Sequence, residues 1–195
     1  MINLSIPYII FYLTTIIWLF PIFKQYRTPY FYTFLFYGLN SFANIIAPKI
    51  IPVKGQLINP IFTMLIIYSL FNKSRKNLIW ILFFTVILIA VEFYIQDRFT
   101  LLINALLHAI ILFIILSQFI KYITEENIIN LFLVLFIIYE ITHVLKNLVV
   151  FSDYINGIVL FYITTFFQLF FGILFTFINI NTKKYSLERF VKSNF

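Results

Sequence analysis

Apolar runs of membrane-crossing length alternate with short polar connectors along nearly the whole chain. Each residue of an α-helix advances the axis by about 1.5 Å, so roughly 20 apolar residues cover the hydrocarbon core of a bilayer. The pattern predicts an all-α fold, namely a polytopic integral membrane bundle of seven transmembrane helices in a single domain, 1–195. The expected spans are approximately residues 4–23, 29–47, 57–71, 78–96, 99–120, 127–151 and 155–180.

The run at 57–71 is the shortest of these segments. A helix of this length crosses if neighbouring residues join it or if the bilayer thins locally. A re-entrant segment is the alternative, and it would leave six crossings. Between the runs lie residues that interrupt helices, such as Pro52 and Gly55. Thr124, followed by two glutamates, is typical of a helix start.

Composition supports a membrane protein and excludes several other classes. Hydrophobic residues make up 63% of the chain and charged residues 11%, against about 25% charged in soluble domains. Cysteine is absent, which excludes a disulfide framework, a cysteine-bound metal and a thiol nucleophile. The net charge of +7 comes from basic residues in the connectors. There they act as topology signals and as contacts for anionic membrane lipid, so no nucleic-acid partner is expected.

The distribution of lysine and arginine predicts the orientation in the membrane. With seven spans and the N-terminus outside, ten basic residues fall on one side and three on the other, and one lies within a span. Because basic connectors face the cytoplasm, the N-terminus is expected outside and the C-terminus inside, in a multi-pass protein of the plasma or inner membrane. The ten are Lys24, Arg27, Lys73, Arg75, Lys76, Lys121, Lys183, Lys184, Arg189 and Lys192, and the three are Lys49, Lys54 and Arg98.

The basic tail, 181–195, follows the last run. Leu187, Val191 and Phe195 recur at helical spacing, with basic residues between them. This pattern suits an interfacial amphipathic helix on the inner leaflet. A frayed basic end is the alternative.

Ionisable side chains inside the expected spans are candidate functional groups, because burying a charge in lipid is costly. Such side chains are Glu92, His108, Glu140 and His143. Glu140, His143 and Asn147 stand at i, i+3 and i+7, which places them on one helical face.

Depth brings these groups to a common level below the outer surface. His108 lies about nine residues inside its span, and His143 and Glu140 lie about eight and eleven residues from the same boundary, hence within roughly 5 Å in depth. Consecutive antiparallel helices usually pack together, so His108 is expected to contact the Glu140 and His143 face. Asn40 and Asn104 fall in the same outer half. Together these residues predict an outward-facing polar pocket above an apolar floor.

Several functions fit such a pocket. The favoured one is a receptor- or sensor-like module that signals through a separate cytoplasmic protein, because the chain carries no output domain. In it Glu140 is the charged centre, His108 and His143 are its partners, and Asn40, Asn104 and Asn147 orient the ligand. A small proton- or ion-coupled transporter or channel using Glu140 is the alternative. An intramembrane metal-dependent hydrolase is less favoured, because the chain has two histidines in all.

Cofactors and structural roles complete the expectations. The last span, 155–180, contains no lysine, which excludes a retinal Schiff base, and no cofactor is expected. The same polar residues could instead hold helices together, since a hydrogen bond between membrane helices is worth about 0.6 kcal/mol. Lys146 stands beside the candidate ionisable groups, and an extended side chain that reaches the interface is the alternative for it.

Overall fold

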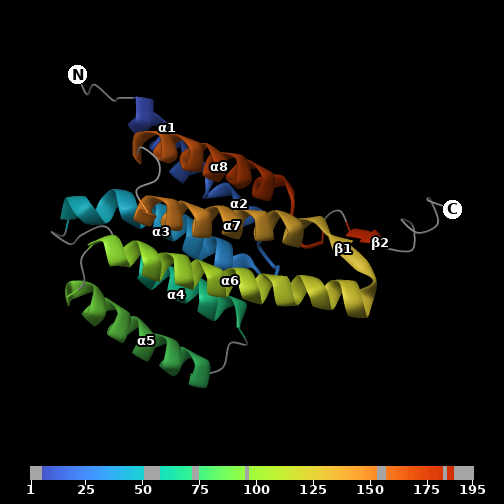
Figure 1. The fold of residues 1–195 in the computed structure, drawn as a ribbon. Helices are drawn as coiled ribbons and strands as arrows, with labels where there is room; N and C mark the ends of the chain where they lie inside the picture. Colours follow the sequence, from blue (N-terminus) through green and yellow to red (C-terminus); the bar gives the residue numbers. More distant parts are fainter. Residues whose placement is uncertain are drawn as a thin grey trace.

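The computed structural model describes residues 6–50, 58–71, 75–94, 97–152, 157–181 and 184–186, and nearly all of them are helical. The all-α prediction is therefore confirmed. The helices lie side by side along a common direction, with the short strands at one end of the bundle (Figure 1). The elements are α1 Ile6–Ile17, α2 Phe20–Lys24, α3 Phe31–Ile50, α4 Ile58–Leu70, α5 Arg75–Tyr94, α6 Asp97–Glu126, β1 Ile128–Asn130, α7 Leu131–Ser152, α8 Gly157–Phe177 and β2 Lys184–Ser186.

Two segments within this described part are long and apolar enough to cross a membrane, Phe99–Glu126 and Leu131–Ser152. Four further apolar helical segments are shorter: Ile9–Lys24, Ile58–Leu70, Lys76–Val91 and Tyr162–Phe177. Length and apolar composition thus identify two candidate membrane-spanning helices. The seven-span arrangement stays a prediction.

The first apolar run is broken, whereas a continuous helix over 4–23 was expected. α1 ends at Ile17 and α2 begins at Phe20, with a turn at Trp18 and Leu19. Pro21 occupies the first turn of α2, where its missing N–H costs no intrahelical hydrogen bond. The proline therefore favours a new helix start at this position over a continuous helix.

The chain between α6 and α7 also differs from the expectation. α6 continues through Thr124 to Glu126, so these residues form the end of a helix and not the start of one. Asn127 has a φ of 51°, a left-handed conformation that ends helices and that asparagine tolerates. β1 follows, and Asn130 then caps α7: its side-chain oxygen accepts a hydrogen bond from the Phe132 N–H at 3.0 Å.

The tail begins as a strand. β2 pairs antiparallel with β1, with Ser186 opposite Ile128 and Lys184 opposite Asn130. These residues are extended, so a helix in the tail does not include them. Residues 187–195, on which the amphipathic pattern rests, lie outside the described part. We call the end of the bundle that holds β1 and β2 the strand end.

An aromatic layer fills the centre of the bundle on the strand-end side. Its side chains have at most 1% of their surface exposed and come from α3, α7, α8 and the turn after α1. Ring centroids within it lie 4.9 Å (Phe34 to Phe175) to 6.3 Å (Trp18 to Phe175) apart, the range of favourable aromatic pairs. We call this set the aromatic floor: Trp18, Phe34, Phe132, Phe136 and Phe175.

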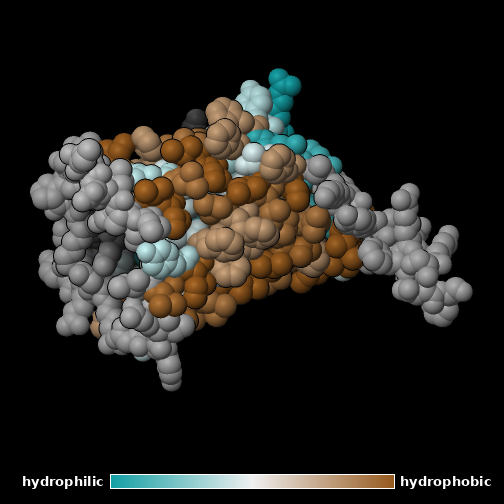
Figure 2. Space-filling model, turned by 90° about the horizontal axis from the view of Figure 1, so that it is seen from above, coloured by the Kyte–Doolittle hydropathy of each residue, from teal (hydrophilic) through white to brown (hydrophobic). Residues whose placement is uncertain are grey.

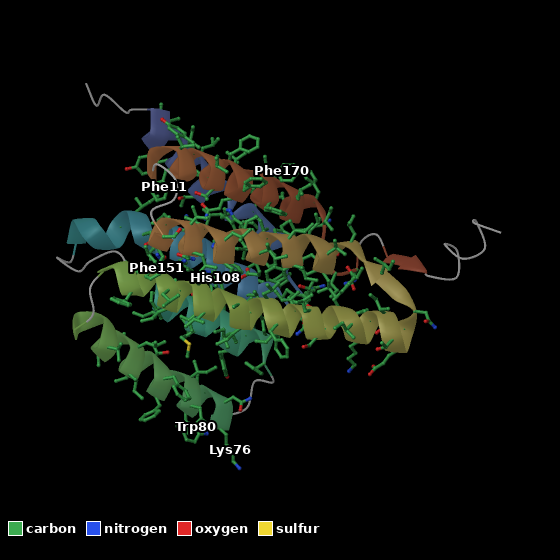
Figure 3. All side chains as sticks on the ribbon, in the orientation of Figure 1. Phe11, Lys76, Trp80, His108, Phe151 and Phe170 are labelled. Atoms are coloured by element: carbon green, nitrogen blue, oxygen red, sulfur yellow. The ribbon has the colours of Figure 1, made fainter. Side chains whose placement is uncertain are left out.

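The exterior is apolar, while polar side chains lie inside. Figure 2 shows a broad hydrophobic surface along the bundle, and Trp80 on α5 and Phe170 on α8 point outward (Figure 3). Buried residues include Thr33, Asn104 and Glu140. An exterior this apolar is unusual for a water-soluble monomer, in which exposed apolar patches are small.

A glycine lets α1 and α8 approach closely, and it supplies the first prediction. A Cβ at Gly172 would stand 2.9 Å from Ile17 Cγ2 and 3.2 Å from Trp18 Nε1. Gly172→Val is therefore expected to separate these elements, weaken the Trp18 hydrogen bond to the Gln168 carbonyl, and destabilise the fold by about 1–3 kcal/mol. Thermal unfolding in detergent measures the loss.

Ala90→Val is the matched control, because Ala90 lies on the exposed face of α5. It places the same valine side chain outside the helix contacts. Equal melting temperatures for the two variants would show that the contact between α1 and α8 at Gly172 is not tight.

Candidate functional site

Glu140 lies at the centre of the site, on α7, with no exposed surface. One carboxylate oxygen accepts a hydrogen bond from the Tyr37 hydroxyl on α3. The other lies 2.8 Å from His108 Nδ1 on α6. The predicted contact between His108 and Glu140 is thus present, and a single carboxylate joins three helices. Both oxygens have partners, as a buried carboxylate requires.

His143 stacks on His108. Their ring centroids are 4.5 Å apart with 21° between the ring planes. The edge of His143 also meets Tyr139, at a centroid distance of 4.6 Å. The two histidines of the chain therefore form a pair between α6 and α7, and Glu140 is hydrogen-bonded to one of them, His108.

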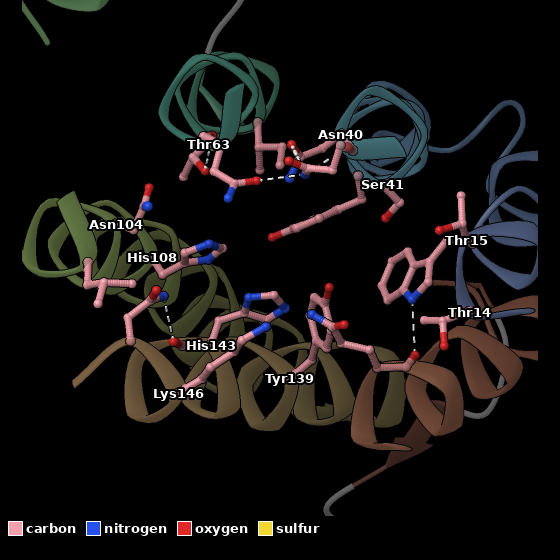
Figure 4. Close-up of a pocket in the computed structure, with 18 of the residues that line it drawn as sticks. Thr14, Thr15, Asn40, Ser41, Thr63, Asn104, His108, Tyr139, His143 and Lys146 are labelled. Atoms are coloured by element: carbon pink, nitrogen blue, oxygen red, sulfur yellow. Dashed lines mark hydrogen bonds between the residues drawn. The ribbon is translucent and has the colours of Figure 1, made fainter. Parts of the chain in front are cut away.

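A cavity of about 420 Å³ opens in front of this pair, in the half of the bundle away from the strand end. Side chains from α1, α3, α4, α6, α7 and α8 surround it, and most of them are polar (Figure 4). We call it the outer pocket. It is lined by Phe11, Thr14, Thr15, Trp18, Tyr37, Asn40, Ser41, Asn44, Asn59, Thr63, Ile66, Thr100, Leu101, Asn104, His108, Tyr139, His143, Lys146, Asn147 and Gln168.

Helix α3 carries a polar stripe into the pocket. Tyr37, Asn40, Ser41 and Asn44 stand at i, i+3, i+4 and i+7 and so face the same side. Asn44 Nδ2 donates to Asn59 Oδ1 on α4 at 2.8 Å and to the carbonyl of Asn40 at 3.0 Å. These amides hold α3 to α4 and also offer polar groups to the cavity.

Two buried polar atoms of the pocket have no partner among the described residues: Asn104 Oδ1 and His143 Nε2. Asn104 is 5% exposed, and leaving a buried acceptor unpaired costs about 1–3 kcal/mol. Native proteins pair nearly all such atoms. A bound molecule would therefore gain the most binding free energy from hydrogen bonds to these two atoms.

The predicted site residues mostly converge. His108, His143, Asn104, Asn147 and Asn40 line the outer pocket. Glu140, expected as the charged centre of the pocket, is hydrogen-bonded to His108 and is not among the residues that line the cavity. Asn147 donates to the His143 carbonyl of its own helix at 2.9 Å.

Two further observations concern Glu92 and the possibility of a metal site. The side chain of Glu92, near the end of α5, lies outside the described residues. Within the described part, no three histidine, aspartate or glutamate side chains come together as a metal site.

The sequence contained signals for residues that the prediction omitted. Lys146, which stood beside the predicted set, lines the pocket; its spacing of i+3 from His143 indicates the same helical face. Tyr37 belongs to the periodic stripe of α3. Trp18 and Tyr139 reach the pocket through tertiary packing, for which the sequence gives no periodic signal.

Comparisons with known proteins supply no relative of this chain. No protein-family model matches the chain, no curated protein is similar to it, and no solved structure matches its fold. The site must therefore be interpreted from its own chemistry.

Removing the central carboxylate provides the second prediction. Glu140→Ala leaves the Tyr37 hydroxyl and His108 Nδ1 without their acceptor inside the bundle, and is expected to cost about 3–5 kcal/mol of stability. Glu140→Gln keeps the volume and one acceptor and should cost less. Chemical denaturation in detergent measures both.

Glu125→Ala is the control. Glu125 pairs with Lys121 at 3.7 Å, but both side chains are mostly exposed, so a loss of about 0.5 kcal/mol or less is expected. A Glu140→Ala protein as stable as this control would contradict a structural role for the buried hydrogen bonds.

Proposed function

We propose that the protein is a receptor- or sensor-like module of the cell membrane. In this proposal seven helices cross the bilayer with the N-terminus outside, the outer pocket binds a small polar ligand, and a separate cytoplasmic protein receives the signal. The observation that carries the proposal is a largely polar cavity, with unpaired buried atoms, that faces one end of an apolar bundle.

The membrane assignment is supported by the apolar exterior together with the two long apolar helices. Helices such as α4, with 13 residues, cover about 20 Å. Tilt, local thinning of the bilayer and flanking polar residues accommodate segments of this length. Lys24, Arg27 and Lys121 lie toward the strand end, which the positive-inside rule assigns to the cytoplasm.

The aromatic floor favours a receptor over a channel or transporter. Its five side chains fill the bundle between the outer pocket and the strand end with almost no exposed surface. An ion or polar solute would have to displace these rings to cross. A bound ligand can instead act by favouring one arrangement of the helices that contact it.

A proton-coupled carrier is the second candidate, favoured by the Glu140 and His108 pair. Buried ionisable pairs of this kind form proton sites in transporters. Such a carrier would need a second conformation in which the floor opens.

The strand end, which is the cytoplasmic end in this proposal, offers a surface for a partner. A second cavity of about 260 Å³ lies there, bordered by Tyr30, Gln118, Lys121, Tyr122 and Glu126 among others. α6 runs without interruption from Asn104 in the outer pocket to this cavity. A continuous helix is a direct physical connection between a ligand site and a cytoplasmic surface.

Cysteine labelling tests the proposal, because the chain has no cysteine of its own. Ser41→Cys places a thiol in the outer pocket and Thr124→Cys places one on the exposed last turn of α6. A membrane-impermeant thiosulfonate added to intact cells is expected to label Ser41→Cys and to leave Thr124→Cys unlabelled. After permeabilisation both should react.

The reverse pattern would show the opposite orientation and overturn an outward pocket. A Ser41→Cys protein that never reacts, while Thr124→Cys reacts after permeabilisation, would show that the pocket is closed to water. For the carrier alternative, uptake into proteoliposomes driven by a pH gradient and lost in Glu140→Gln is the distinguishing result.

A further inference from the structure

The walls of the outer pocket contain one side chain with a full formal charge, that of Lys146. No aspartate or glutamate is among the lining residues. Glu140, the nearest carboxylate to the histidine pair, is engaged by Tyr37 and His108 and has no exposed surface. A ligand that carries only a positive charge would therefore find no anionic partner in the cavity.

Within the part of the chain that the structure describes, no carboxylate pairs with Lys146. Among the described residues, the buried ion pair joins His108 to Glu140, and none involves Lys146. Its side chain lies next to His143 on α7 (Figure 4). The Lys146 side chain is partly exposed, and an anion bound in the cavity would pair with its ammonium through charge-assisted hydrogen bonds.

Asn104 adds a second requirement. Its side-chain oxygen is buried and accepts no hydrogen bond within the described part of the chain. An N–H or O–H group of a ligand can donate to this oxygen in place of water. His143 Nε2, which is also unpaired, can complete the polar contacts on the same side.

Size and wall chemistry limit the ligand further. A cavity of about 420 Å³ is in the usual range for small-molecule sites. Phe11, Trp18 and Tyr139 supply aromatic surface on the walls. The body of the ligand can therefore be partly apolar.

We infer that the outer pocket binds a small organic carboxylate that carries a hydrogen-bond donor next to its acid group, as hydroxy acids and α-amino acids do. This rests on the proposed function of the pocket. The carboxylate pairs with the Lys146 ammonium, and the neighbouring O–H or N–H donates to Asn104 Oδ1. The ligand is a soluble molecule of the extracytoplasmic side.

Matched pairs of probes test the inference on the purified full chain in detergent. Lactate is compared with lactamide, and L-leucine with L-leucinamide, by thermal stabilisation and calorimetry across a panel of hydroxy acids and α-amino acids. At least one carboxylate is expected to bind about tenfold or more tightly than its amide, because charge-assisted hydrogen bonds are the stronger ones. Lys146→Gln should remove this preference and Lys146→Arg should keep most of it.

Lys76→Gln is the matched control, since Lys76 is an exposed lysine on α5 and is not among the residues that line the outer pocket. It should retain the preference for the carboxylate. Asn104→Leu should weaken the binding of lactate more than the binding of propionate, which lacks the hydroxyl donor.

The alternative outcomes are distinct. If amides bind as well as carboxylates and Ser41→Trp abolishes binding, the pocket is a receptor site but the inferred ligand class is wrong. If no carboxylate in the panel stabilises the protein while Ser41→Cys is labelled from outside, the inference is also overturned and the open pocket stands. If only phosphatidylglycerol stabilises the protein, in a Lys146-dependent way, the anion is a lipid headgroup and the inference fails.

Discussion

Glu140 and its two hydrogen-bond partners impose the constraint on which the bundle depends. Glu140 has no exposed surface, so water is not available to satisfy its carboxylate and the protein must supply donors from other helices. Tyr37 on α3 and His108 on α6 do so, and their positions fix α3, α6 and α7 relative to one another. The stacked His143 and the aromatic floor then pack against this arrangement.

Other buried polar groups also need hydrogen-bond partners, and in the outer pocket two such groups have none within the described part of the chain. Gln25 donates to the Ile178 carbonyl and Thr33 bonds to Ser69, so polar groups near the strand end are satisfied within the protein. In the outer pocket, Asn104 Oδ1 and His143 Nε2 are unpaired. Unsatisfied groups destabilise a fold, and their concentration in one cavity is expected for a site that exchanges a ligand for water.

Much of this organisation was predictable from spacing, and some was not. The depth of His108 and Glu140 follows from helix rise, so their contact could be predicted. Helix ends were harder to predict. Pro21 and Asn127 start or end helices through local backbone preferences, which a hydropathy pattern does not record. Lys146 was left out of the predicted site because a lysine in a membrane helix can extend to the surface, and only the neighbouring helices show that it lines a polar cavity.

The arrangement also indicates how binding in the proposed receptor could reach the cytoplasmic side. A ligand that bridges Lys146 on α7 and Asn104 on α6 contacts two helices that are already joined through Glu140 to α3. At the inner end, α6 meets the start of α3 again, where the Tyr30 hydroxyl donates to Gln118 Oε1 at 2.5 Å. Because packed helices move as rigid elements, a small shift of α6 against α3 at the pocket must be accommodated at this second contact. The ligand changes the population of such a shifted state only to the extent that it binds that state more tightly, which makes the charged contact to Lys146 the natural source of the difference.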